Sequence, residues 1–227
     1  MNSSTSIPNK LTHLVDDEYR AFAIKGILTD YPFLGVRTPD LRALAKEIIA
    51  SGSGEEFLKE EPLSYEELTI QGFIIASLPY EKMKKRLPVY VAKIDNWATT
   101  DMVCATIKSI KKNREDFLDV IDEFLKSSRE FTVRTALVCL KSYYITPDYL
   151  AVIFDRVVEA RDREEYYIKM AVAWLVSECF IKFPDETYGF LKSGLLPAWT
   201  QNKSISKIRD SFRVPDEAKA ALLKLRK

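Results

Sequence analysis

Glycine is scarce in this chain, with 7 residues among 227. None of these glycines has the spacing of a Walker phosphate loop or of a dinucleotide-binding fingerprint, which both need glycine where the backbone approaches phosphate. We therefore expect no nucleotide cofactor. Histidine is rarer still, because His13 is the single one and lies near the N-terminus. A catalytic triad built on histidine is not expected.

Cysteine is also rare, and Cys104, Cys139 and Cys179 are odd in number and far apart. They lie in apolar runs such as LVCL at 137–140, which is typical of small buried residues in a reducing compartment. With one histidine they cannot build a zinc site of ordinary spacing, so no metal is expected. The longest apolar run, at 170–176, is too short to cross a bilayer, and the N-terminus has no signal-peptide pattern. The sequence predicts a cytoplasmic protein with no membrane partner.

An excess of either charge is absent as well. The chain has 34 basic and 33 acidic residues, a net charge of +1, so its total charge gives no support for nucleic-acid binding. The distribution is uneven, since 16–18 and 55–61 are acidic whereas 108–114 and 203–213 are basic. Runs of this kind are most often solvated helix faces.

Apolar residues recur at helical spacing, as in the stripe over 133–144, and no sustained alternation is present. Helix starts are expected at Thr38, at a capping box over 64–67 and at Thr146. In each case a hydroxyl side chain would satisfy one of the first free amides of the helix. The sequence predicts an all-α fold of many short helices.

Three segments resemble one another: 95–110, 129–144 and 164–179. Each opens with polar residues, becomes apolar, and is separated from the next by enough chain for an antiparallel helix. A period of roughly 35 to 40 residues is typical of HEAT-type helix pairs, which stack because one pair cannot bury its apolar face alone. We expect one HEAT-like domain over 1–227, with a loosely ordered N-terminus at 1–18 and a C-terminal helix at 215–227.

The register of these repeats can be chosen in two ways. An offset of 35 superposes two cysteines on Trp174, whereas offsets of 37 and 40 superpose Trp97, Arg134 and Trp174. The second choice agrees better with the helical stripes. It predicts one shared face on each of three successive helices. These faces carry Trp97, Asp101 and Lys108 on the first helix, Arg134 and Lys141 on the second, and Trp174 and Glu178 on the third.

Two indoles, a carboxylate and an arginine suit a cationic sugar or base beside a phosphate. Indole faces attract cations, a carboxylate stabilises developing positive charge, and arginine binds phosphate bidentately. Asp101 could also activate a water molecule at an anomeric carbon. Each residue has a structural alternative: Trp97 and Trp174 as core aromatics, Asp101 as a local helix-start group, and Arg134 as a solenoid surface residue.

Several stretches together resemble a known family. They are FLGVRTPDLRALAKEI (33–48), NWATTD (96–101), VRTALV (133–138), AVAWLV (171–176) and SISKIRDSFRV (204–214). In order and spacing they are similar to the AlkD-like family of HEAT-repeat DNA alkylation-repair glycosylases, over about residues 20 to 214.

The resemblance implies a curved, right-handed α-solenoid whose concave face holds duplex DNA. It also implies excision of cationic purines such as 3-methyladenine and 7-methylguanine, without flipping the base. The catalytic residues of the family would correspond to Asp101, Trp97 and Trp174, with Arg134 nearby. The chain departs from the family at 96 and 98, where members often have a further aromatic residue and a further carboxylate.

Phosphate contacts are expected from the basic residues on or near these helices. They are Arg134, Lys108, Lys111, Lys112, Lys141, Lys203, Lys207 and Arg209. The expected partner is duplex DNA containing alkylated bases, and the expected enzyme is monofunctional, cofactor-free and monomeric. The alternative is a non-catalytic HEAT-repeat scaffold that binds nucleic acid or protein on its concave face.

Overall fold

The computed structural model describes residues 7–227, and this part of the chain is built from helices without a β-strand. Its one element of β-type pairing is an isolated bridge between Val15 and Val36. The predicted all-α class is confirmed. Within the same residues no helix is long and apolar enough to cross a membrane, and no group of His, Cys, Asp or Glu side chains could hold a metal ion.

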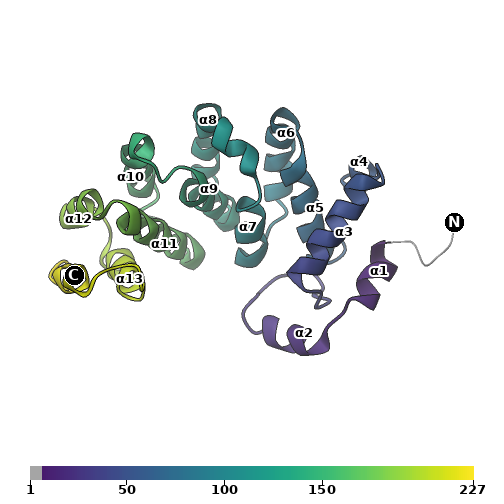
Figure 1. The fold of residues 1–227 in the computed structure, drawn as a ribbon, viewed down its shortest axis with the longest axis horizontal. Coiled ribbons are helices and arrows are strands. Elements are labelled where there is room, and N and C mark those ends of the chain that lie inside the picture. Colours follow the sequence, from purple (N-terminus) through teal and green to yellow (C-terminus); the bar gives the residue numbers. More distant parts are fainter. Residues whose placement is uncertain (1–6) are drawn as a thin grey trace. The chain divides into compact units, whose positions relative to one another are not determined.

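The helices belong to two compact units, one ending at Ser109 and the other beginning at Ile110. Figure 1 labels helices α1 to α13 along the chain. The first unit contains α1 (Ile7–His13), α2 (Asp17–Ala23), α3 (Thr38–Ala50), α4 (Gly54–Phe57), α5 (Tyr65–Ser77), α6 (Tyr80–Val91) and α7 (Trp97–Cys104). The second contains α8 (Arg114–Leu125), α9 (Glu130–Tyr143), the 3₁₀ helix η3 (Pro147–Tyr149), α10 (Leu150–Glu159), α11 (Tyr166–Lys182), α12 (Pro184–Lys192), α13 (Ala198–Arg209) and α14 (Asp216–Leu223). The short 3₁₀ helix η2 (Lys108–Lys112) joins the two units in sequence.

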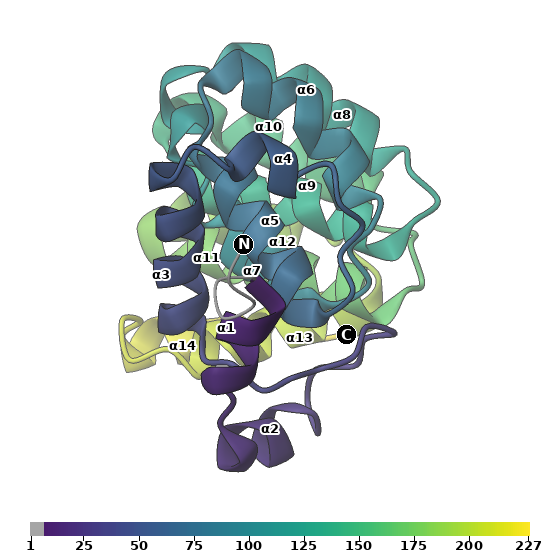
Figure 2. The ribbon, with the colours of Figure 1, turned by 90° about the vertical axis from the view of Figure 1, so that its right-hand side faces the viewer.

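In the first unit α5 is the central helix, packed against α3, α6 and α7 (Figure 2). Every residue of α5 from Tyr65 to Ala76 is buried, including polar residues such as Glu66 and Gln71, so this helix has no face in water. Gly72 permits the close packing, because a Cβ there would lie 2.2 Å from the Tyr90 hydroxyl oxygen and 2.4 Å from Val103 Cγ2. A side chain larger than hydrogen therefore does not fit at this point of α5.

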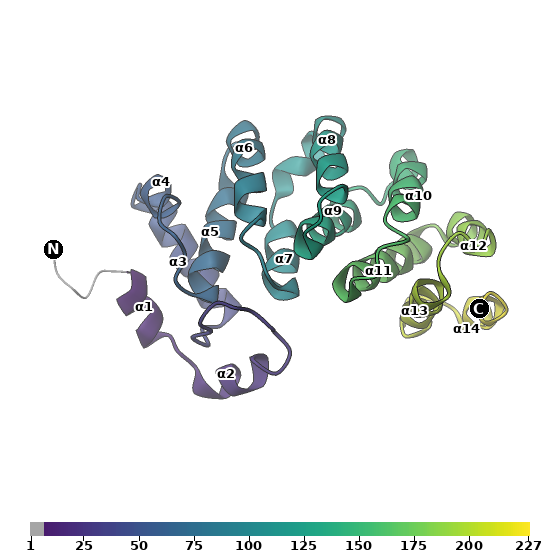
Figure 3. The ribbon, with the colours of Figure 1, turned by 180° about the vertical axis from the view of Figure 1, so that it is seen from behind.

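In the second unit the helices form two layers, visible in Figure 3. One layer has α9, α11 and α13 side by side, and the other has α8, α10 and α12. Helix α11 is the centre, since it packs against α9, α12 and α13. The predicted similar segments thus correspond to α7, α9 and α11, one in the first unit and two in the second.

The predicted helix starts have different outcomes. Ser64 is confirmed as the N-cap of α5, because its hydroxyl oxygen accepts a hydrogen bond from the Glu67 amide at 3.1 Å. The helix start predicted at Thr38 is confirmed, but its capping role was wrong: Arg37 has the extended N-cap conformation, and Thr38 is the first helical residue. Its hydroxyl is used elsewhere, in a 3.3 Å contact with the Met102 sulfur. Thr146 precedes the 3₁₀ helix η3 and makes no side-chain cap.

The two ends of the chain bear on the expected domain organisation. The expected loose N-terminus falls partly on residues 1–6, outside the described part of the chain. From Ile7 onward the chain forms α1, whose Leu11 is fully buried. The C-terminal helix expected at 215–227 falls on α14.

All three cysteines are buried and are thiols rather than disulfides. Burial raises the pKa of the Cys179 thiol to about 12, and Cys104 and Cys139 are 2% and 0% exposed. These thiols are core residues in the described fold.

Candidate functional site

Helix α7 carries the first predicted pair, Trp97 and Asp101. The helix begins where it does because Asn96 is its N-cap: the Asn96 side-chain oxygen accepts a hydrogen bond from the Thr99 amide at 2.8 Å. Trp97 is the first helical residue and Asp101 follows one turn later, and both side chains are half-buried. A half-buried carboxylate one turn from an indole is suited to stabilising a cation.

Lys108 does not share the face of Asp101, so this part of the sequence prediction was wrong. Helix α7 ends at Cys104 with Ala105 as its C-cap, and Lys108 opens the separate 3₁₀ helix η2. The Lys108 amide donates to the Thr106 carbonyl at 2.8 Å, in a tighter turn than an α-helix makes. The helical period that would have aligned Lys108 with Asp101 therefore stops before it.

Trp97 is held at both its edge and its face. Its indole Nε1 donates to the carbonyl of Gly26 at 2.8 Å. Its ring packs on an apolar cluster of residues that includes Ala23, Ile27 and Ala98. Trp97 thus combines the two roles considered for it, since one part is a core aromatic and the half-buried remainder is accessible.

The two positions at which the chain departs from the resembling family are structural here. Asn96 is completely buried and caps α7, as described above. Ala98 is 5% exposed and lies in the apolar cluster next to Trp97. A carboxylate or a large aromatic ring at 98 would have to enter this cluster, so the packing of the first unit accounts for the small residue.

In the second unit Trp174 lies on α11 and is half-buried. The Lys141 ammonium of α9 lies 3.6 Å from the centre of its ring, a close cation–π contact. The helical spacing placed Lys141 and Trp174 on the shared faces of successive helices, but it predicted no contact between the two side chains. Their contact gives the second unit an indole face that is already occupied by a cation.

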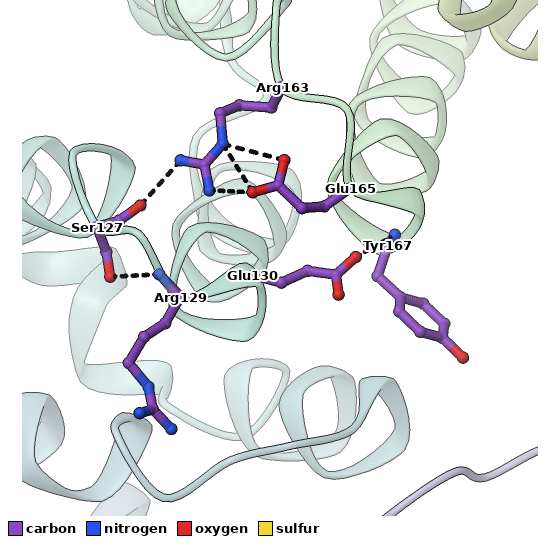
Figure 4. A network of polar contacts seen from close by, with 6 residues as sticks. All are labelled: Ser127, Arg129, Glu130, Arg163, Glu165 and Tyr167. Carbon is purple, nitrogen blue, oxygen red and sulfur yellow. Dashed lines mark hydrogen bonds and ion pairs between the residues drawn. The ribbon is translucent and has the colours of Figure 1, made fainter.

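Arg134 on α9 is buried to 6% exposure, more than a phosphate-binding residue on an open surface would be. Its Nη1 donates to the Tyr167 carbonyl at 2.8 Å. The Tyr167 amide in turn donates to Glu130 Oε1 at 2.6 Å (Figure 4). Helix α9 thus binds both backbone polar groups of Tyr167 at the start of α11. Arg134 therefore has a structural role in addition to any contact with a ligand.

A second set of contacts in Figure 4 fixes the chain just before α11. Arg163 donates through Nη1 to the Ser127 carbonyl at 2.8 Å and through Nε to the Glu165 carboxylate at 3.1 Å. The hydrogen bond from Arg163 lowers the pKa of the Glu165 carboxyl. The start of α11, and with it the helix that carries Trp174, is thus held to the end of α8 and the start of α9.

Two predicted DNA-binding lysines, Lys203 and Lys207, lie half-buried on α13. Burial is the main cause that lowers the pKa of Lys207, followed by the positive charges of Lys203 and Arg134, while Asp210 acts in the opposite direction. These cations of the second unit are therefore within electrostatic range of one another. Such a concentration of positive charge in a partly desolvated place favours an anion.

The remaining predicted DNA-binding residues are exposed. They are Lys108, Lys111 and Lys112 in η2, and Arg209 at the end of α13. Lys111 and Lys112 also line a surface hollow of about 390 Å³ together with Arg114.

A second aromatic and cationic group, which the sequence motifs did not predict, lies in the second unit. The rings of Tyr166 and Trp199 lie 6.2 Å apart, and the Lys169 ammonium lies 5.1 Å from the Trp199 ring. Both aromatic residues are exposed, at 54% and 42%. The sequence spacing could have pointed to this group, because Trp199 follows Tyr166 by 33 positions, the same separation as between Lys141 and Trp174.

Comparisons with known proteins agree with this description. Residues 7–208 match the model of a family described as DNA alkylation repair enzyme. The crystal structure of smu.31 from Streptococcus mutans UA159 is similar in fold, with a TM-score of 0.59 and 20% sequence identity over 89% of this chain and 98% of that one. The comparison with curated proteins gives no match.

Proposed function

Because the chain belongs to the DNA alkylation repair enzyme family, we propose that it is a glycosylase that removes cationic alkylated purines from duplex DNA. The expected substrates are 3-methyladenine and 7-methylguanine. The observation that carries the proposal is Asp101, a half-buried carboxylate one turn after Trp97 on α7.

The chemistry needs little from the protein. A purine alkylated at N3 or N7 already carries a positive charge, so the bond from C1′ to the base breaks with its electron pair leaving on a neutral base. The deoxyribose becomes an oxocarbenium ion, and water adds to C1′ and loses a proton. Asp101 would stabilise the cation and position this water, and no general acid or cofactor is required.

The indoles and the cations have supporting roles in this proposal. Trp97 would pack on the deoxyribose of the lesion. Trp174, whose ring already has the Lys141 ammonium over one face, is a catalytic residue only as the family resemblance implies. Lys203 and Lys207 are better candidates for direct phosphate contacts than Arg134, whose Nη1 is bound to the Tyr167 carbonyl. The packed helix pairs within each unit support HEAT-like repeats, whereas the curved right-handed solenoid, the monomeric state and the cytoplasmic location stay predictions.

The test is the release of free 7-methylguanine and 3-methyladenine from methylated duplex DNA under single-turnover conditions. Asp101→Asn keeps the size of the side chain and removes its charge, so we expect base release to slow by roughly 10²- to 10³-fold with DNA binding retained. Asp119→Asn, at an exposed carboxylate on α8, is the matched control and should behave as wild type.

Two other outcomes would decide against the proposal. If folded wild-type protein binds duplex DNA but releases no base above the spontaneous rate, it is not a glycosylase for these lesions, and the scaffold alternative gains support. If Asp101→Asn retains full activity, Asp101 is not the catalytic carboxylate.

A further inference from the structure

Two aromatic side chains of the second unit lie next to each other and remain in water. Tyr166 is the first residue of α11 and Trp199 is the second residue of α13, two helices that pack side by side (Figure 3). Their ring centres are 6.2 Å apart, and the residues are 54% and 42% exposed. We call Tyr166 and Trp199 the aromatic pair. Neighbouring aromatic rings that the fold leaves in water indicate a site of interaction.

The aromatic pair is fixed by contacts within its unit. The Lys169 ammonium lies 5.1 Å from the Trp199 ring and forms an ion pair with Glu164 at 3.1 Å. The Tyr166 ring meets the Tyr167 ring edge to face at 5.2 Å, and α9 binds the backbone of Tyr167, as described above. Stacking of a planar ligand on the exposed part of these rings would therefore cost little conformational entropy.

The face of α13 that carries Trp199 also carries positive charge. Lys203 and Lys207 follow Trp199 by four and eight positions, so the three side chains share this face of the helix. Helix α13 contains no aspartate or glutamate. Among residues 7–227, neither Lys203 nor Lys207 forms an ion pair. These two cations are therefore available to an anionic ligand beside the aromatic pair.

The carboxylates of the neighbouring chain do not cancel this charge, because each already has its own cation. For the carboxylates in α11 or directly before it, the ion pairs are Glu164–Lys169, Glu165–Arg163 and Glu178–Arg213. Asp210, the exposed C-cap of α13, acts to raise the pKa of Lys207, but burial and the charges of Lys203 and Arg134 outweigh it. The surroundings of the aromatic pair thus favour a ligand with negative charge.

Aromatic rings for stacking, together with cations for phosphates, are what proteins use to bind unpaired nucleotides. A paired base inside a duplex is stacked on its neighbours, so its faces are closed to a protein ring. A base that has lost its partner can leave the stack at a lower cost and offer a face. The combination of rings and lysines on α11 and α13 therefore favours an unpaired nucleotide over an intact base pair.

We propose that Tyr166 and Trp199 form a stacking platform for an unpaired nucleobase of DNA, with Lys203 and Lys207 bound to phosphates of the same strand. This inference deepens the proposed function and rests on it, since excision of an alkylated purine leaves the opposite base without a partner. The platform gives the protein a preference for duplexes that contain an unpaired base. It lies apart in sequence from Trp97 and Asp101, so it contributes to recognition and not to bond cleavage.

The first test compares the affinity of the full-length protein for two duplexes of the same sequence. One is fully paired, and the other has a tetrahydrofuran abasic-site analogue that leaves one thymine unpaired. We expect wild type to bind the second duplex about tenfold more tightly, the effect of roughly one stacked base. Trp199→Ala should lose most of this preference while its affinity for the paired duplex changes by less than about twofold.

Two further variants separate stacking from damage to the fold. Trp199→Phe keeps an aromatic ring and should retain most of the preference, and Tyr166→Ala, at the more exposed ring, should weaken it even if Trp199→Ala does not fold. Tyr188→Ala is the matched control, because Tyr188 is a half-buried aromatic residue on α12 in the other layer of the unit (Figure 3). It should bind both duplexes as wild type does.

The second test places 5-iodouracil at the unpaired position. Irradiation links this base to an aromatic side chain stacked on it, so peptide mass spectrometry should find the cross-link at Tyr166 or Trp199. Cross-links only at other residues, or equal preferences in wild type, Trp199→Ala and Tyr166→Ala, would overturn the platform. If wild type binds neither duplex, the proposed function and the platform both fail. Excision by wild type with equal affinity for the two duplexes would reject the platform alone.

Discussion

At the scale of single residues, Lys207 shows how the surroundings of a side chain set its charge. Burial and two neighbouring cations lower its pKa, so keeping it charged in the free protein is unfavourable. A bound phosphate would offset both penalties, because it adds a counter-charge beside the ammonium. Residues that oppose folding but favour a ligand are typical of binding sites.

Lys207→Met should therefore stabilise the free protein at neutral pH and weaken its binding to DNA. The pKa of Lys207 is lower in the folded than in the unfolded state, so the folded protein loses the proton first as pH rises. The stability of wild type should then increase relative to Lys207→Met between about pH 7 and about pH 10. Urea unfolding of both proteins at the two pH values measures this. A gap that stays constant or widens with pH would contradict the assignment.

The sequence predicted several of these residues but not their contacts. Lys203, Lys207, Trp97 and Asp101 were selected from motifs and from helical spacing, and the structure puts them on α13 and α7. The sequence could not predict that Arg134 would bind a backbone carbonyl of α11, the next helix of the same layer. Such contacts depend on how α9 packs on α11, which the spacing along either helix does not contain.

At the scale of elements, the apolar stripes predicted where helices lie better than how they are buried. The stripe over 133–144 falls on α9, but burial in α9 extends beyond the stripe, since every residue from Thr132 to Leu140 is buried. The predictions were poorest at the ends of helices, where Thr38 was taken for a cap and α7 was continued to Lys108. A cap depends on the conformation of the preceding backbone, which in α3 is extended at Arg37 rather than at Thr38.

Helix α5 gives a sharp test of packing between elements. Gly72→Ala should destabilise the protein by about 1 to 3 kcal/mol, because the new methyl group would meet the buried Tyr90 ring and Val103. Gly189→Ala in α12 is the matched control, since nothing lies within 4 Å of its Cβ position. It should be neutral or stabilising by up to about 1 kcal/mol. Urea unfolding compares the two, and equal effects would mean that the close packing around α5 is not rigid.

At the scale of the whole molecule, a net charge of +1 means that any affinity for DNA must come from local groups of cations. Each phosphate neutralised contributes about −0.9 to the slope of log K against log salt concentration. The basic residues described above would therefore give a steep slope in a protein that is nearly neutral in total.

We expect a slope between about −4 and −7 for an undamaged duplex. The double variant Lys203→Gln with Lys207→Gln should reduce the magnitude of this slope by about two. Lys126→Gln, at an exposed position after α8, is the control and should change the slope by less than about one. Titrations at several salt concentrations give these slopes. A slope near zero in wild type would point to a scaffold that binds protein through apolar contacts.

The buried thiols have a consequence for a protein of this family. Methylating agents, which create the damage that such proteins repair, also attack proteins, and the thiolate is the most nucleophilic group they meet there. Here every cysteine is inside the core, and the Cys179 thiol stays protonated at neutral pH. The folded chain therefore exposes none of its cysteine sulfur atoms to these electrophiles, so its core should survive conditions under which DNA is methylated.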